Sequence, residues 1–301
     1  MFTSPFKVEE AVKLVFVQDF LIQDLIGGAE LSMYALHESA PIPFLIVRSH
    51  QLTEAIVEQN KHCHWVFGNF SNLHPTAIEY FISSGISYSV FEHDYKFCKW
   101  RSIEKHEIEG KEKCNCEKEP IGKLIERFFL KAKQVWFCSK KHMQVYLDRF
   151  PALRLANCEV LSATFDENFF RKIVPLMESL PDRKKSGWLT LDSDSWIKGT
   201  DDAIKWLKDN GKSYKLIKNM SPDQVLEAMA NAEGFITLPR GADVSNRMVT
   251  EATLLGCEVV TNDKVQHADE DWLIDKNKQN TLAWLYNRRK VFWDRTLTFI
   301  K

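Results

Sequence analysis

Short apolar runs that alternate with helix-forming segments constrain this 301-residue chain more than any other feature. Strands are expected in the first half at residues 12–19, 44–48, 66–69, 86–91, 134–139 and 159–161. The second half repeats the alternation, with strands at residues 187–191, 214–217, 235–238 and 257–261. Strands and helices that alternate in this way form parallel sheets covered by helices. We therefore expect an α/β protein with two doubly wound, Rossmann-like domains.

The domain boundaries follow from a change in composition. Residues 175–186 are polar and charged and contain two prolines, so we expect them to link the domains. The expected domains are residues 1–170 and residues 187–279. Residues 280–301 are expected to form one long amphipathic helix that ends the chain.

Two carboxylates, Asp243 and Glu251, frame a strand–loop–helix unit in the second half. Ser245 or Asn246 can cap the helix, and Arg247 lies one turn before Glu251, so these two side chains share a face. A helix N-terminus favours anions, and an adjacent arginine favours them more. A carboxylate beyond that point can accept two hydrogen bonds from a sugar diol. The unit therefore predicts a nucleotide or nucleotide-sugar ligand.

Two features of the first half lie where such a ligand would bind. Gly27 and Gly28 separate a strand from a helix, and glycine lets the backbone approach a phosphate closely. His93 follows the strand at residues 86–91, and open α/β sheets bind ligands at the carboxyl ends of their strands. A turn without a ligand and a histidine held by local hydrogen bonds explain the same residues equally well, so both interpretations stay open.

Residues 95–122 form a highly charged segment that contains candidate metal-binding residues and candidate anion-binding residues. Cys98, His106, Cys114 and Cys116 are residue types that bind zinc, but their spacing fits no standard zinc signature. The pattern favours a charged lid or an acceptor-contacting loop without metal. Basic residues of the segment can hold an anionic acceptor, although a solvated charged surface is the simpler interpretation. These residues are Lys96, Lys99, Arg101 and Lys105.

Composition excludes several classes of protein. The net charge of −1 gives no overall attraction to nucleic acid or to an anionic membrane. No apolar run approaches the ~18 residues that a membrane span needs. The first ten residues carry acids where a secretory leader would be apolar. The seven cysteines are therefore expected to be reduced, in a cytoplasmic protein.

An ordered set of short motifs resembles the retaining glycosyltransferases of family 4, which have the GT-B fold. The motifs are GGAE at residues 27–30, EHD at 92–94, AKQVWFCS at 132–139, EVLSATFDENFF at 159–170, Lys198-Gly199, and the Asp243-to-Glu251 pair followed by helix, glycine and strand. The resemblance implies a donor cleft between the two domains and a C-terminal helix that crosses back onto the first domain.

The resemblance also implies roles for individual residues. Glu251 would hold the ribose of the donor nucleotide, and Lys198 would pair with its diphosphate. Asp243 would lie near the hydroxyls of the donor sugar, and His93 near the transferred sugar. Gly27 and Gly28 would let the backbone approach the phosphates or the acceptor.

Two positions depart from the family pattern. Asp243 stands where the family has glutamate, which shortens its reach by one methylene. Ser193 stands where the family has an arginine, and this removes a charge-assisted contact worth ~1.5–3 kcal/mol. Arg240 or Arg247 can supply the missing charge. Asp192-Ser193-Asp194 has the spelling of a metal-binding motif, but we interpret it as a loop and expect no metal at the donor site.

The leading hypothesis is a metal-independent, retaining glycosyltransferase that takes its sugar from a UDP- or GDP-type nucleotide sugar and requires no other cofactor. Two alternatives stay open: a non-catalytic nucleotide-binding or assembly subunit, and a sugar-nucleotide epimerase of the same fold. The acceptor can be a glycan, a lipid-linked sugar, a protein or modified DNA. The sequence does not indicate an oligomeric state, and it predicts no stable membrane insertion.

Overall fold

The computed structural model describes residues 2–3 and 12–300 of the chain. Two compact units make up the fold. Unit 1 consists of Met1–Asp166 together with Asn287–Lys301, and unit 2 consists of Glu167–Tyr286. The prediction that no secretory leader precedes the first strand rests mainly on residues outside the described part of the chain.

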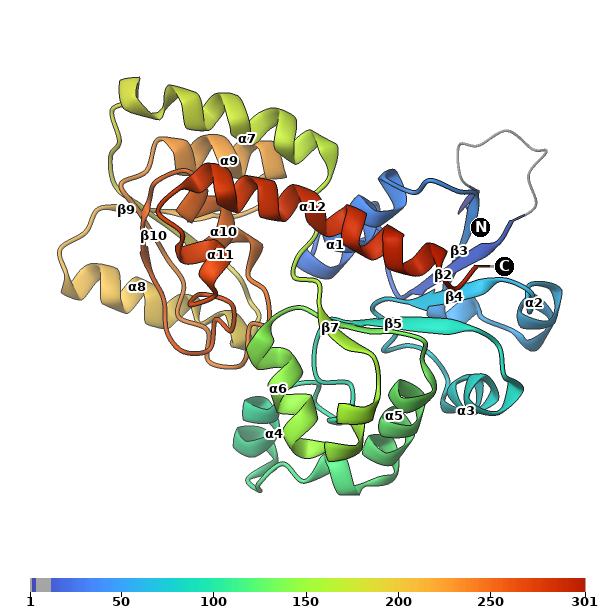
Figure 1. The fold of residues 1–301 in the computed structure, drawn as a ribbon. Coiled ribbons are helices and arrows are strands. Elements are labelled where there is room, and N and C mark those ends of the chain that lie inside the picture. Colours follow the sequence, from blue (N-terminus) through green and yellow to red (C-terminus); the bar gives the residue numbers. More distant parts are fainter. Residues whose placement is uncertain (1, 4–11, 301) are drawn as a thin grey trace. The chain divides into compact units, whose positions relative to one another are not determined.

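Unit 1 is built on a sheet whose strands, within the described residues, follow the order β1-β3-β2-β4-β5-β6-β7 (Figure 1). All neighbouring strands are parallel except β1 and β3, which are antiparallel. The strands are β1 (Phe2–Thr3), β2 (Leu14–Gln18), β3 (Phe44–Arg48), β4 (His64–Phe67), β5 (Tyr88–Glu92), β6 (Val135–Phe137) and β7 (Cys158–Val160). The central strands β2, β4 and β5 are buried along their whole length, as strands covered on both faces must be.

Aromatic side chains attach helices to both faces of the unit 1 sheet. On one face, Phe81 and Phe128 contact the ring of Phe67, with ring centroids 4.9 Å and 5.2 Å away. On the other face, the ring centroids of His37 and Phe292 lie 4.5 Å and 6.5 Å from that of Phe16. The helices of the unit are α1 (Gly28–Glu38), α2 (Glu54–Gln59), α3 (Pro75–Ser84), α4 (Ile103–Gly110), α5 (Pro120–Lys131), α6 (Lys140–Arg149) and the last turns of α12 (Lys278–Leu297).

Unit 2 contains a parallel sheet with the order β11-β10-β8-β9 in the part of the chain that is described. Its strands are β8 (Trp188–Leu191), β9 (Tyr214–Ile217), β10 (Gly234–Ile236) and β11 (Glu258–Val260). Its helices are α7 (Glu167–Ser179), α8 (Thr200–Asp209), α9 (Pro222–Ala230), α10 (Arg247–Leu254), α11 (Asp271–Ile274) and the first turns of α12. Trp188, Ala203, Leu207 and Ile236 form a buried core between α8 and the sheet.

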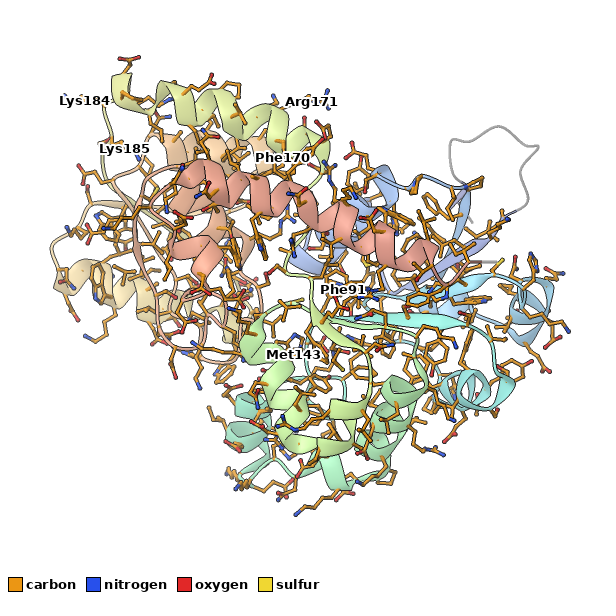
Figure 2. All side chains as sticks on the ribbon, in the orientation of Figure 1. Phe91, Met143, Phe170, Arg171, Lys184 and Lys185 are labelled. Carbon is orange, nitrogen blue, oxygen red and sulfur yellow. The ribbon has the colours of Figure 1, made fainter. Side chains whose placement is uncertain are left out.

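The end of α10 is stabilised by a lysine from a distant part of unit 2. Lys185, labelled in Figure 2, donates hydrogen bonds to the carbonyl oxygens of Leu255 (2.6 Å) and Gly256 (2.8 Å). Gly256 has φ +67°, the left-handed conformation that helix ends favour. A cation at a helix C-terminus also complements the helix dipole. These contacts fix the helix that carries Arg247 and Glu251.

The prediction of a linker at residues 175–186 is wrong for most of that range. Helix α7 runs through residue 179, and a 3₁₀ turn follows at Leu180–Asp182. The two prolines and the charges suggested a linker, but Phe169, Phe170 and Ile173 are buried at helical spacing. Their burial outweighs the backbone hydrogen bond that Pro175 cannot donate inside the helix.

Helix α12 contributes to both units. Near its start, Trp284 stacks on Trp272, with ring centroids 4.3 Å apart and planes 2° from parallel, within unit 2. In its last turns, which belong to unit 1, Trp293 Nε1 donates a hydrogen bond to Ser39 Oγ (3.1 Å). The final helix therefore crosses from unit 2 back to unit 1.

Candidate functional site

The loops after β8 and β10 bring together two of the predicted site residues of unit 2. Lys198 Nζ lies 2.9 Å from Asp243 Oδ2, although 45 positions separate them in the chain. The Asp243 side chain is 8% exposed, whereas that of Lys198 is 34% exposed. Both loops follow the carboxyl ends of parallel strands, where open α/β sheets bind ligands. The ammonium group is therefore held in place and is still accessible to an anionic ligand.

A glycine makes this approach of the two loops possible. Gly199 follows Lys198 with φ +61°, and a Cβ at this position would lie 1.9 Å from the carbonyl oxygen of Leu238. No side chain fits at that distance from a backbone atom, and the left-handed conformation also disfavours side chains. Gly199 thus fixes the position of Lys198 beside the loop that carries Asp243.

Asn246 joins Asp243 to the start of α10. Its Nδ2 donates to Asp243 Oδ2 (2.9 Å), and its Oδ1 accepts from the backbone N–H of Val249 (3.3 Å), which caps the helix. Asn246 was expected as one of two possible caps, but its bond to Asp243 was not foreseen. On the same helix, Arg247 and Glu251 are each 9% exposed, so both are held by the protein interior.

Two other cations of unit 2 are paired with carboxylates. Arg240 Nε and Nη2 lie 2.6 Å and 3.1 Å from the two carboxylate oxygens of Asp202, and the hydrogen bonds from Arg240 lower the pKa of that carboxyl. Lys218 Nζ pairs with Asp192 (2.8 Å). Arg240, like Lys198, is therefore held by a carboxylate and is still partly exposed.

In unit 1, His93 lies directly beyond the end of β5 and is half-buried. Its ring packs on Phe91, with centroids 4.1 Å apart, and its Nδ1 lies 3.6 Å from Cys138 Sγ. Its Nε2 is buried and has no hydrogen-bond partner among the described residues. Burial lowers the pKa of His93 to about 3, so the imidazole is neutral near pH 7. The neutral ring thus keeps one buried nitrogen that makes no hydrogen bond to the described residues.

A charged cluster lies at the same strand end. Lys96 Nζ donates to Asp94 (3.1 Å) and to Glu92 (3.3 Å). Burial raises the pKa of Glu92, although the nearby Lys96 opposes this shift. Burial alone would also raise the pKa of Asp94, but Lys96 and Arg101 outweigh it and lower that pKa. The Asp94 carboxylate thus faces two cations, Lys96 and Arg101.

His142, which no sequence pattern indicated, supports this cluster from α6. The backbone N–H of Cys138 donates to its Nδ1 (3.3 Å), so its Nε2 carries the hydrogen and donates to the carbonyl oxygen of Asp94 (2.8 Å). Burial lowers the pKa of His142 to about 4, which keeps it neutral. His142 thereby connects the end of β6, at Cys138, to the backbone of Asp94.

A hydrogen-bond network links the predicted glycine turn to the end of β5. Arg101 Nε donates to Asp94 (2.7 Å) and its Nη2 to Asn69 Oδ1 (3.2 Å), while Asn69 Nδ2 donates to Glu30 Oε1 (3.4 Å). Glu30 is buried in the first turn of α1, and burial raises its pKa. A Cβ at Gly27 would lie 2.4 Å from Glu30 Oε2. Gly27 therefore leaves room for the Glu30 carboxylate. The glycine pattern in the sequence had suggested only a close approach to a phosphate.

The other candidate acceptor-binding residues, Lys96, Lys99 and Lys105, also have partners. Lys99 pairs with Glu112 (3.1 Å), and Lys105 Nζ lies 5.6 Å from the centroid of the Trp100 ring. Lys96 is buried in the cluster described above. Arg101 is the partly exposed member of the four that faces the strand ends.

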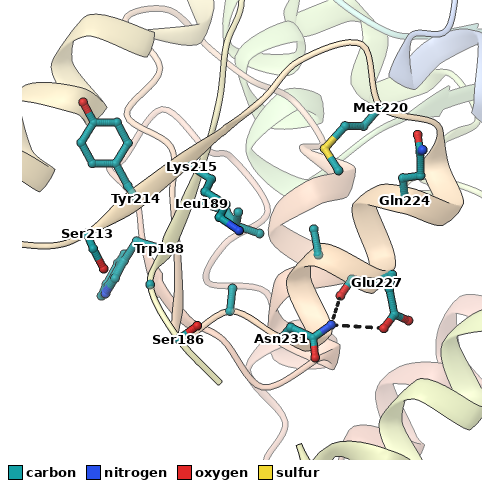
Figure 3. A pocket seen from close by; sticks show the side chains of 13 residues that line it. Ser186, Trp188, Leu189, Ser213, Tyr214, Lys215, Met220, Gln224, Glu227 and Asn231 are labelled. Carbon is teal, nitrogen blue, oxygen red and sulfur yellow. Dashed lines mark hydrogen bonds between the residues drawn. The ribbon is translucent and has the colours of Figure 1, made fainter. Parts of the chain in front are cut away.

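A cavity of about 500 Å³ in unit 2 does not contain the predicted site residues. Figure 3 shows its lining, in which Trp188 and Tyr214 come from the amino ends of β8 and β9, Glu227 comes from α9, and Asn231 directly follows α9. The hydrogen bonds between Asn231 Nδ2 and Glu227 (2.8 Å to its carbonyl oxygen, 3.1 Å to Oε1) close one side. Ligands of this sheet type bind at the opposite, carboxyl ends of the strands. We therefore do not assign this cavity to the donor.

Comparison with solved structures identifies the architecture. A UDP-forming α,α-trehalose-phosphate synthase from Burkholderia xenovorans matches with a TM-score of 0.58 and 10% identity, over 96% of this chain and 99% of that chain. HepE from Anabaena in complex with UDP-glucose matches with a TM-score of 0.55 and 14% identity, over 96% and 97%. This chain has the GT-B fold.

A further GT-B match has a different activity. A UDP-GlcNAc 2-epimerase from Methanocaldococcus jannaschii, in complex with UDP-GlcNAc and UDP, matches with a TM-score of 0.50 and 12% identity, over 96% of this chain and 100% of that chain. No model of a known protein family matches the sequence, and no curated protein matches it. At these identities the comparisons establish the fold alone.

Helix α12, with 20 residues, has the length to cross a bilayer, but Arg288, Arg289 and Lys290 interrupt it. Within residues 2–3 and 12–300, no helix meets the requirements for a membrane span.

Proposed function

We propose that this chain is a glycosyltransferase that moves a sugar from a nucleotide-sugar donor to an acceptor. The observation that carries the proposal is the pairing of Lys198 with Asp243 at the carboxyl ends of β8 and β10. A lysine fixed beside a helix N-terminus is suited to stabilise a leaving nucleoside diphosphate without a metal ion. GT-B structures in complex with UDP-glucose support a donor of this chemical class.

Each predicted residue of unit 2 has a part in this proposal. Lys198 binds the diphosphate, and Glu251, on the same helix face as Arg247, holds the ribose of the nucleotide. Arg247 adds positive charge at the first turn of α10. Asp243 orients Lys198 and accepts hydrogen bonds from the donor sugar. Because Asp243 is anchored by Asn246 as well as by Lys198, its carboxylate stays in place when Lys198 turns to a phosphate.

In unit 1 we propose His93, directly beyond the carboxyl end of β5, as the catalytic residue that meets the transferred sugar. Gly27 and Gly28 keep the first turn of α1 compact, and Arg101 receives an anionic part of the acceptor. The reaction proceeds with retention, as the resemblance to family 4 implies. We also propose a cytoplasmic location for this enzyme, as the sequence predicts.

Donor turnover tests the proposal. The purified chain is incubated with a panel of UDP- and GDP-sugars, and release of nucleoside diphosphate is measured with and without candidate acceptors. We expect slow hydrolysis of one donor and faster turnover with its acceptor. Lys198→Ala should lower kcat/KM by about 10²-fold or more, the scale of one electrostatic contact to a leaving group. The matched control is Lys205→Ala, an exposed lysine on α8 that pairs with Asp209 and should leave kcat/KM unchanged.

The same assay separates the alternatives. If the chain converts a UDP-sugar to its epimer and consumes no acceptor, it has the epimerase activity named for one structural neighbour. Binding of UDP without turnover of any donor would assign a non-catalytic nucleotide-binding subunit. NMR of the transferred sugar determines whether the anomeric configuration is retained, and inversion would contradict the family 4 assignment.

A further inference from the structure

Four side chains of the 95–122 segment converge in the interior of unit 1. The ligand atoms of Cys98, His106, Cys114 and Cys116 all lie within 4.8 Å of one another, and all four side chains are buried. They come from three places: the turn after β5, helix α4 (Figure 1), and the chain that leads into the 3₁₀ turn Cys116–Lys118. Chain folding thus gathers residues that their sequence spacing did not mark as a metal site.

The distances fit a tetrahedral metal ion. His106 Nδ1 lies 3.5 Å from Cys98 Sγ and 3.3 Å from Cys116 Sγ, and Cys114 Sγ lies 3.7 Å from Cys98 Sγ. Around a tetrahedral zinc ion, with Zn–S about 2.3 Å and Zn–N about 2.0–2.1 Å, sulfurs stand about 3.8 Å apart and a sulfur and a nitrogen about 3.5 Å apart. A disulfide would require sulfurs about 2.05 Å apart, so Cys98 and Cys114 are separate thiols.

A contact with Glu112 orients the His106 ring so that its Nδ1 faces the cysteine sulfurs. Its Nε2 lies 3.0 Å from Glu112 Oε1, which leaves Nδ1 to face Cys98 and Cys116. A carboxylate on the second ring nitrogen is the usual support of a zinc-binding histidine, because it fixes the tautomer and the ring orientation. This contact is independent of the four-atom cluster.

The backbone around the cysteines is also fixed. Arg149 Nη1 donates to the carbonyl oxygen of Cys114 (3.0 Å) and pairs with Glu117 (2.6 Å). A Cβ on Gly122 of α5 would lie 2.1 Å from the carbonyl oxygen of Cys116, so glycine allows this loop to rest directly on the helix. The two cysteine positions are therefore held from outside the cluster.

We propose that Cys98, His106, Cys114 and Cys116 bind one Zn²⁺ ion in a closed, structural site. Three thiolates and one imidazole fill all four tetrahedral positions, so none is open for water or substrate. The unusual spacing of these residues in the sequence favoured a metal-free segment, but their assembled geometry outweighs the spacing. The inference concerns the stability of unit 1 and holds whether or not the chain transfers a sugar.

The proposed ion would also position Arg101. This residue has φ +56° in the turn that begins at Cys98, and its N–H donates to the carbonyl oxygen of Cys98 (2.8 Å). From that turn its guanidinium reaches Asp94 and Asn69. A metal bound at Cys98 would therefore hold the residue that joins the end of β5 to the start of α1.

Metal content of the full chain tests the inference directly. The protein is purified without a metal-binding tag and without added metal, and zinc is quantified by mass spectrometry. We expect about one zinc per chain, with an X-ray absorption spectrum that fits three sulfurs at about 2.3 Å and one nitrogen at about 2.0–2.1 Å. A zinc content far below one, or a spectrum dominated by oxygen ligands, would overturn the proposal. These readouts use the wild-type chain and do not depend on its activity.

Variants with matched controls sharpen the test. Cys116→Ser should lose the bound zinc, whereas Cys257→Ser, whose sulfur only contacts the carbonyl oxygens of Met229 and Ala232, should keep it. Glu112→Gln should weaken zinc binding about 10–100-fold in a chelator competition. The exposed Glu109→Gln, on the same segment, should not.

Thiol counting addresses the competing chemistry of these cysteines. After denaturation with a chelator and without reductant, all seven thiols should react. Five reactive thiols would reveal a disulfide and would contradict the zinc site.

Discussion

Lys198 and Asp243 form an ion pair in which the buried partner is the anion and the accessible partner is the cation. This asymmetry means that an arriving phosphate competes with Asp243 for the same ammonium group. The carboxylate keeps its bond from Asn246 when the lysine is drawn away. Asp243 therefore positions the Lys198 ammonium group before a phosphate binds, and the pair is not a rigid cross-link between the two loops.

The first prediction follows from this competition. Asp243→Asn should bind UDP about fivefold more tightly than the wild type, because removing the charged partner returns about 1 kcal/mol of interaction to the phosphates. The same variant should lower donor turnover, because it loses the carboxylate that accepts from the sugar. Calorimetry with UDP and initial-rate assays measure the two effects. Weaker UDP binding by the variant would contradict the proposed competition.

Gly199 offers a test of the loop geometry that does not need a substrate. Gly199→Ala should lower the free energy of unfolding by about 2–5 kcal/mol, since a left-handed side chain and a backbone clash with Leu238 are combined. Gly211 has the same φ of +61° but nothing within 4 Å of a Cβ, so Gly211→Ala should lose only the conformational part, roughly 1–2 kcal/mol. Urea denaturation compares the two. Equal losses would show that the two loops do not touch at Gly199.

The low pKa of His93 leads to a prediction about pH dependence. Burial keeps this imidazole neutral down to about pH 3. His93 should therefore cause no inflection near pH 6.5 in the pH profile of kcat, and the profiles of the wild type and of a His93 variant should have the same shape. His93→Asn should lower kcat about 10²-fold at every pH tested, the effect of losing one placed hydrogen-bond group. A profile whose shape changes in the variant would instead assign a titrating role to His93.

His37 gives a prediction about acid stability. Burial lowers its pKa to about 3 in the folded chain, against 6.5 for a histidine exposed to water. Since the unfolded chain takes up the proton first, stability declines as the pH falls from 6.5 toward 3. Between pH 7 and pH 5 this single residue should remove about 2 kcal/mol.

A variant isolates the contribution of His37. His37→Phe keeps the ring contacts with Phe16 and Phe44 and discards a buried Nε2 that has no partner among the described residues. Its free energy of unfolding should therefore fall about 2 kcal/mol less than that of the wild type between pH 7 and pH 5. Denaturation curves at both pH values measure this difference, and parallel losses in the two proteins would rule out the explanation.

Local patterns predicted most of the elements because their causes are local. The strands predicted at residues 44–48 and 214–217 have the observed bounds Phe44–Arg48 and Tyr214–Ile217. The buried strands were visible as apolar runs. Helix α7 was missed because a charged, proline-containing surface hides an apolar face that only packing reveals.

The contacts of the candidate site could not be predicted to the same extent. The sequence named Lys198 and Asp243 separately, but their contact depends on how two strand ends meet. The network from Glu30 through Asn69 to Arg101 likewise joins three distant parts of the chain, so no spacing rule indicates it. The position of Asn246 was predicted for its capping role alone, because capping is a local property and its bond to Asp243 is not.

The return of α12 to unit 1 bears on the order in which the chain is made. Phe292 and Trp293 cover Phe16, and Phe292 also contacts Trp136, yet unit 2 lies between them and unit 1 in the sequence. During translation the first unit must therefore wait, with an apolar face of its sheet uncovered, until all of unit 2 has left the ribosome. A truncated chain that stops before α12 would keep that face open permanently.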